Sequence, residues 1–131
     1  MATSSADFKS RCCRSLSVDF PDRLALDADG AWVVCVGSYR VYRIAPNGKK
    51  STVIDDSEAA TAKQLEAAFV ALTLDRPQLS AARGRRLRNI TSRAFGGADL
   101  RTVYMGCLGG DSRATFRSPV AGVQPVHWNW P

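Results

Sequence analysis

Residues 32–44 hold two runs of apolar and aromatic residues around a short polar break, in the order Trp32-Val33-Val34-Cys35-Val36-Gly37-Ser38-Tyr39-Arg40-Val41-Tyr42-Arg43-Ile44. Both runs are rich in the β-branched and aromatic residues that strands favour. Gly37-Ser38, between them, is a pair of residues typical of a tight turn. The pattern predicts two antiparallel strands, at 32–36 and 40–44, joined as a hairpin.

The sequence on either side extends this hairpin into a meander. The apolar residues 24–26 precede it across the turn signal Asp29-Gly30, and residues 51–54 follow it across Pro46-Asn47-Gly48. Strands that follow one another through short turns pair antiparallel with their neighbours. Four such strands form one blade of a β-propeller, whose repeat in better-known propellers is about 40 to 50 residues long.

A helical insertion is predicted over about residues 58–87. Asp56-Ser57-Glu58 supplies N-capping and first-turn acids to a helix expected at 61–74, whose apolar residues lie on one stripe. Pro77 is expected to stop this helix. We expect the stripe, which includes Leu65, to pack the helix onto the edge of the sheet.

Strand character returns after the insertion, at residues 89–95, 102–107 and 114–117. A turn that contains Asp99 separates the first two of these segments, much as Asp29-Gly30 separates the first two strands of the earlier unit. The two units form a faint repeat. The pattern predicts a second blade.

Length and composition favour one soluble globular domain. The chain has 131 residues, of which 45% are hydrophobic and 23% charged. No apolar stretch approaches the roughly 20 residues of a transmembrane helix, and residues 1–9 lack the apolar core of a signal peptide. We therefore expect no membrane partner and a cytoplasmic location. Residues 1–17, polar and without periodicity, are expected to be a weakly ordered lead-in to a folded unit at 18–131.

The net charge of +6 raises the question of nucleic-acid binding. The densest basic run, Arg83-Gly84-Arg85-Arg86-Leu87-Arg88, lacks the interleaved aromatic residues that stack on bases. We interpret it as a solvated loop or helix end, with a binding patch as the alternative, and expect no nucleic-acid partner. The four cysteines and single histidine have no zinc-finger spacing.

Three segments together resemble a known family. They are Pro21-Asp22-Arg23-Leu24-Ala25-Leu26-Asp27-Ala28-Asp29-Gly30-Ala31-Trp32-Val33, Arg40-Val41-Tyr42-Arg43-Ile44-Ala45-Pro46-Asn47-Gly48-Lys49, and Asn89-Ile90-Thr91-Ser92-Arg93-Ala94-Phe95-Gly96-Gly97-Ala98-Asp99-Leu100-Arg101-Thr102-Val103-Tyr104. In this order they look like the C-terminal part of the gluconolactonase and regucalcin (senescence marker protein) family. The resemblance runs from about Phe20 to near the C-terminus, and the helical insertion interrupts it.

The resemblance implies a fold and a chemistry. Members of the family are six-bladed β-propellers that hold a divalent metal, often calcium, at the central channel and hydrolyse sugar lactones or related esters. The fold expected here is accordingly all-β, a partial β-propeller of about two to three blades of antiparallel four-stranded sheet with one inserted helical segment. The expected cofactor is a divalent metal, calcium first, with zinc or manganese as alternatives, and the expected substrate is a small lactone.

Asp22 is the one metal ligand that the resemblance carries over. The family holds its metal with a Glu, an Asn and an Asp of a Pro-Asp-Gly motif, and Asp22 in Pro21-Asp22-Arg23 matches only the last. The resemblance implies that Asp22 both binds the metal and acts as general base toward water. The alternative is that Asp22 caps a turn. Arg23 stands where the family has glycine, and its charge competes with a cation for the carboxylate.

Two hypotheses for function follow. The first is a gluconolactonase-like hydrolase that is weakly active or inactive as this chain alone, because calcium takes six to eight oxygen ligands and Asp22 supplies one carboxylate. The second is a non-enzymatic interaction module. In that case an open strand edge pairs with another copy of the chain or with another protein.

Overall fold

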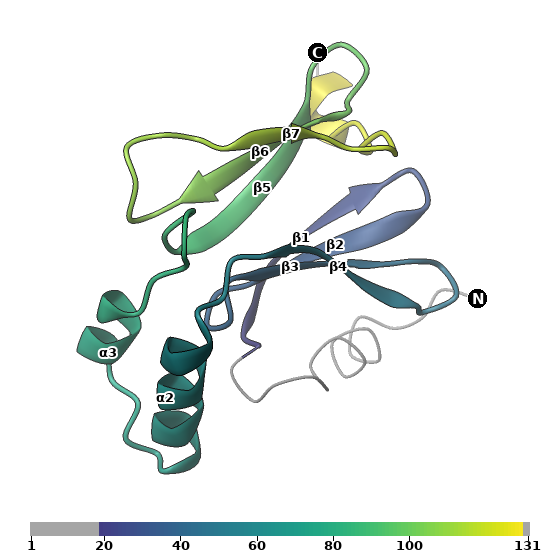
Figure 1. Ribbon diagram of the computed structural model, residues 1–131. Coiled ribbons are helices and arrows are strands. Elements are labelled where there is room, and N and C mark those ends of the chain that lie inside the picture. The colour runs from purple at the N-terminus through teal and green to yellow at the C-terminus, as the bar shows by residue number, and fades with distance from the viewer. Residues whose placement is uncertain (1–18, 130–131) are drawn as a thin grey trace.

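The computed structural model describes residues 19–129, and the predicted lead-in at 1–17 lies outside them. This part of the chain is mostly β, with two antiparallel sheets and two short α-helices. Figure 1 shows the three-stranded sheet above the four-stranded sheet, with both helices to one side. No helix within residues 19–129 is long and apolar enough to cross a membrane.

The first sheet is the predicted meander. Its strands pair antiparallel in chain order, β1-β2-β3-β4. Their bounds are β1 Pro21–Asp27, β2 Gly30–Cys35, β3 Arg40–Ile44 and β4 Lys50–Asp55. The central strand β2 is buried on both faces, which explains its continuous apolar run. The expected hairpin turn at Asp29-Gly30 is confirmed, since Asp27 pairs with Gly30.

The second sheet has three strands rather than the predicted four. It runs in the order β5-β6-β7, with β5 at Ile90–Gly96, β6 at Thr102–Cys107 and β7 at Thr115–Arg117. The chain then forms a 3₁₀ helix, η1, at Val126–Asn129. Pro125 immediately before it has no N–H to donate to a strand ladder.

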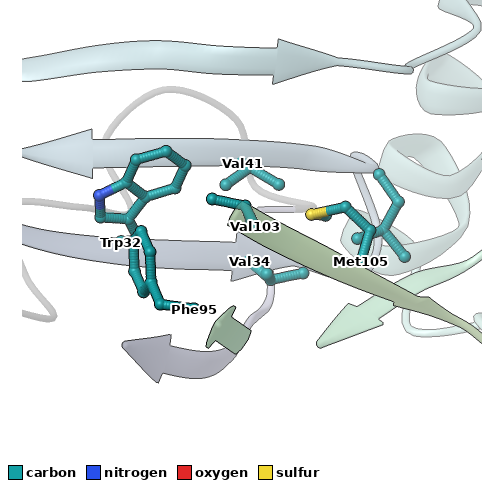
Figure 2. Close-up of a cluster of buried hydrophobic side chains, with 7 residues drawn as sticks. Trp32, Val34, Val41, Phe95, Val103 and Met105 are labelled. Atoms are coloured by element: carbon teal, nitrogen blue, oxygen red, sulfur yellow. The ribbon is translucent and has the colours of Figure 1, made fainter. Parts of the chain in front are cut away.

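The two sheets pack face to face around one apolar core. Trp32, Val34 and Val41 come from the first sheet, and Ile90, Phe95, Val103 and Met105 from the second. The Trp32 and Phe95 rings meet edge to face with centroids 5.3 Å apart. Figure 2 shows the two side chains next to each other in the core. Burial of these seven side chains holds the sheets together.

Two further contacts close one side of this packed pair. The guanidinium of Arg93 in β5 donates hydrogen bonds to the carbonyl of Trp32 and, at 3.0 Å, to the carbonyl of Arg23. Burial lowers the pKa of Arg93 to about 10.

The segment after β7 also pairs with the first sheet, because the Ala28 N–H donates to the Ala121 carbonyl at 2.8 Å. Gly122 and Asp27 form a bridge there.

The insertion predicted at about 58–87 lies between β4 and β5, but the bounds of its helices differ from the predicted helix at 61–74. Helix α2 spans Ala59–Val70 and helix α3 spans Arg76–Ala81, so the insertion is not helical up to residue 87. Pro77 lies in the first turn of α3 rather than stopping α2. A first-turn proline lacks only an N–H that would have no helical partner. Glu58 is the N-cap of α2, as the acidic signal indicated.

The insertion packs at the end of the first sheet. Leu65 of α2 is buried with Tyr39 and Ala82, as predicted, but Phe69 and Leu72 of the same predicted stripe are exposed. The Tyr39 hydroxyl donates to the Ala82 carbonyl at 2.8 Å. These contacts fix the position of the chain that runs from α3 back to the second sheet.

Candidate functional site

Asp22 lies at an irregularity of strand β1. Pro21 pairs with Cys35 and Arg23 with Val34, so Asp22 is the extra residue of a β-bulge. Its side chain is exposed and makes no hydrogen bond or ion pair within residues 19–129. The alternative that Asp22 caps a turn is wrong, because Asp22 lies inside a strand.

The surroundings of Asp22 do not fit a calcium ion. Calcium takes six to eight oxygen ligands, which proteins supply by grouping carboxylates and carbonyls. In the described part of the chain, no three residues among histidine, cysteine, aspartate and glutamate are grouped to hold a metal. Within residues 19–129, Asp22 therefore belongs to no set of side chains that could hold a metal.

Asp27, not Asp22, is the aspartate of β1 with a dense set of partners. Its carboxylate accepts hydrogen bonds at 2.6 Å from both Trp32 Nε1 and Arg43 Nε, and at 3.0 Å from the Asp29 N–H. Burial alone would raise the pKa of Asp27, but these hydrogen bonds and the Arg43 charge lower it to about 2. Each of these partners lies within the first sheet. This cluster joins β1, β2 and β3 and is structural.

The open edge of the first sheet is at β4. The β1 edge is partly covered, because Leu26 and Ala28 bond to the segment after β7. By contrast, residues 51–54 of β4 make no backbone hydrogen bond to any described element except β3. An edge strand of this kind presents N–H and C=O groups to an incoming chain.

An apolar groove of about 630 Å³ lies beside this open edge. Its apolar lining comes from Val53 and Ile54 of β4, Leu87 of the loop before β5, and Phe116 of β7. Its polar lining is Asp55, Asp56, Arg85 and Arg86. We call this hollow the edge groove. Its lining joins β4 of the first sheet to β7 of the second.

Asp56 positions the loop that forms one wall of the edge groove. It is buried, and its carboxylate accepts the backbone N–H groups of Arg86 at 2.9 Å and Leu87 at 2.8 Å. Its own carbonyl accepts the Arg85 N–H at 2.8 Å. A Cβ at residue 84 would overlap the Asp56 carboxylate, so Gly84 permits this close approach.

A second hollow of about 780 Å³ adjoins the edge groove. Arg86 and Leu87 line both hollows, so the two surfaces are continuous. The second is also lined by Arg88 and by residues 107–114, which include Arg113 and Asp111. We call it the arginine hollow. Its lining includes three arginines and one aspartate.

The arginines of this hollow, like Arg23, Arg76 and Arg83, form no ion pair within the described residues. Arg40, Arg43 and Arg117 form ion pairs with aspartates. Within residues 19–129, Arg86 and Arg113 make no side-chain hydrogen bond or ion pair, and the Arg88 guanidinium donates only to the Gly109 carbonyl at 3.3 Å. Positive charge is therefore available on this surface.

Sequence reasoning found parts of this surface and missed its organisation. The run from Arg83 to Arg88 was interpreted as a solvated loop, and its arginines are exposed as expected. Asp56 was assigned to the cap of α2, although its carboxylate binds a loop some 30 residues away in sequence. The one available signal was Gly84 within the arginine run, because an isolated glycine there indicates close approach of another group.

Comparison with known proteins gives no relative from which to transfer a function. No protein-family model, curated protein or solved structure matches this chain.

Proposed function

We propose that this chain is a non-enzymatic interaction module that binds an extended segment of another polypeptide along strand β4. The observation that carries the proposal is the unpaired edge of residues 51–54 directly beside the edge groove. Strand addition uses both features, since main-chain hydrogen bonds provide affinity and side-chain pockets provide selectivity.

The groove supplies the selective part of such binding. The register of β4 shifts at Val53, so the neighbouring residues Val53 and Ile54 both line the groove. Side chains of an added strand alternate between the two faces of the sheet, so every second residue of a bound segment would face this apolar lining. Val53, Ile54 and Phe116 are only partly buried. A segment with small or β-branched apolar residues at alternate positions would complete their burial.

The charge of the chain favours a different partner over a second copy. Each copy carries a net charge of +6, and two copies that approach each other therefore repel. Lys50 begins β4 and Arg85 lies at its other end, where it donates to the Asp55 carbonyl at 2.8 Å. A centred antiparallel β4 pair between copies would set Lys50 opposite Asp55, so the preference for a different partner rests on the net charge of the chain.

The proposal is tested by selecting binders from a library of random decapeptides and measuring their affinity by fluorescence anisotropy. Adjacent residues of a strand direct their N–H groups to opposite sides, so one of Ser51 and Thr52 points its N–H toward β3 and the other points its N–H outward. Both Ser51→Pro and Thr52→Pro are made, and each removes one N–H. The variant that keeps the wild-type melting temperature is the one that has lost the outward N–H.

We expect selected peptides to bind the wild-type chain and to lose at least tenfold in affinity for the stable proline variant. Selection of no binders, or of binders that the proline variant holds equally well, would contradict strand addition. Analytical ultracentrifugation over a range of concentrations checks the choice of partner. A dimer that the proline variant abolishes would identify a second copy as the occupant instead.

Lactone hydrolysis stays a prediction of the sequence resemblance, and so does the propeller. The chain-order meander β1 to β4 and the face-to-face packing of two sheets support the idea of two successive blades. The predicted activity is tested with purified protein, a sugar lactone, and calcium, zinc or manganese. Turnover that Asp22→Ala leaves unchanged would remove Asp22 from the mechanism.

A further inference from the structure

We infer that the segment bound at β4 carries aspartate or glutamate residues next to its apolar part, and that the arginine hollow holds their carboxylates. This inference rests on the proposed strand addition and names the chemistry of the partner. Its basis is the position and pairing of Arg86, Arg88 and Arg113.

The first step is continuity between the two hollows. Arg86 and Leu87 belong to both linings, so the two hollows adjoin at these residues. The partner segment would therefore extend from an apolar surface directly onto a basic one.

The second step is the difference in charge between the two hollows. The carboxylates of the edge groove are already engaged, since Asp55 pairs with Arg40 and Asp56 accepts two loop N–H groups. In the arginine hollow, Asp111 is the single carboxylate facing three arginines, and it pairs with none of them within the described residues. The hollow is complementary to an anion.

The third step is the backbone that presents Arg88. Arg88 and the next residue, Asn89, have φ angles of +40° and +42°, in the left-handed region that non-glycine residues seldom adopt. A contact with Gly109, whose Cβ would lie 3.2 Å from the Cβ of Arg88, accompanies this conformation. The local structure thus holds Arg88 at the hollow at a conformational cost.

Guanidinium groups favour carboxylates because both are planar and bind through two parallel hydrogen bonds. The test uses two synthetic peptides, each with a core of five alternating valines and threonines. One carries three aspartates at its N-terminal end and the other carries them at its C-terminal end. Matched peptides carry three asparagines or three phosphoserines instead. Affinities are measured by fluorescence anisotropy for the wild type, for Arg86→Gln and Arg113→Gln, and for Arg76→Gln and Arg83→Gln as exposed controls outside both hollows.

We expect one of the two aspartate peptides to bind roughly tenfold more tightly than its asparagine counterpart. Arg86→Gln and Arg113→Gln should each remove most of that preference, and the controls should keep it. Equal affinity for aspartate and asparagine peptides, with binding still sensitive to the β4 proline variant, would overturn this inference and leave strand addition standing. Binding of the phosphoserine peptide alone would overturn the assignment to carboxylates. No binding by any of these peptides would overturn this inference, whereas strand addition is judged by the peptides selected from the random library.

Discussion

The carboxylate of Asp56 accepts a hydrogen bond from the backbone N–H of Leu87 at 2.8 Å, across 31 positions in the sequence. This contact joins the end of the first sheet to the loop that leads into the second. It places Leu87 and Arg86 beside β4, where both line the edge groove. The proposed binding surface depends on this one buried side chain.

Removal of the Asp56 carboxylate should therefore weaken both stability and peptide binding. Asp56→Ala leaves the Arg86 and Leu87 N–H groups without their acceptor, which we expect to cost about 2 to 3 kcal/mol of unfolding free energy. Urea denaturation measures this loss. Asp22→Ala is the control, because that exposed carboxylate has no hydrogen bond within the described residues. Equal stability of the two variants would show that Asp56 does not hold the loop.

Gly84 should be intolerant of any side chain. Its added Cβ would overlap the Asp56 carboxylate, so we expect Gly84→Ala to lower the unfolding free energy by about 1 to 3 kcal/mol. Gly110→Ala is a matched control, since the nearest atom to its added Cβ is 3.9 Å away. The two variants can be compared by thermal melting. A Gly84→Ala protein that melts with the wild type would mean that the loop lies farther from Asp56.

Acid should destabilise the protein through Asp27. The pKa of Asp27 is about 2 in the folded state, below its usual 3.8. A carboxyl group with a lowered pKa stabilises the folded state above its unfolded pKa, and this contribution disappears as the pH falls through the folded pKa. Asp27→Asn should cost about 2 to 4 kcal/mol near neutral pH, and this difference from wild type should shrink between about pH 4 and pH 2.

Denaturant midpoints of the wild type and Asp27→Asn, measured across that pH range, check this expectation. Asp111→Asn is the control, because it removes an exposed carboxylate that has no ion pair within the described residues. It should stay within about 0.5 kcal/mol of the wild type. If Asp27→Asn lowers the unfolding free energy by the same amount at every pH, the ionised Asp27 carboxylate is not what stabilises the wild-type protein.

The fold was predictable where local pattern sets it. The runs at 32–36 and 40–44 and the turn at Asp29-Gly30 identified the first meander, because strand propensity and turn geometry act over neighbouring residues. The four-stranded blade expected for the second unit is not complete within residues 19–129, where the sheet has three strands. There the chain pairs Gly122 with Asp27 of the first sheet and then turns at Pro125.

The candidate site was much less predictable, because its contacts are distant in sequence. Asp56 stands just before a helix, so its local context indicated a cap, whereas its partners lie beyond the whole insertion. The arginine hollow likewise combines the run around Arg86 with Arg113 from the loop after β6. Nothing in the spacing of these residues indicates that they share a surface.

Hydrogen–deuterium exchange of β4 tests the central proposal most directly. The wild-type chain would be measured alone and saturated with a selected peptide, with the exchange of amides 50–55 followed individually by nuclear magnetic resonance. Strand addition predicts that outward N–H groups among residues 51–54 become protected, since each gains a main-chain acceptor. Saturated binding that leaves these amides exchanging at their original rates would contradict it.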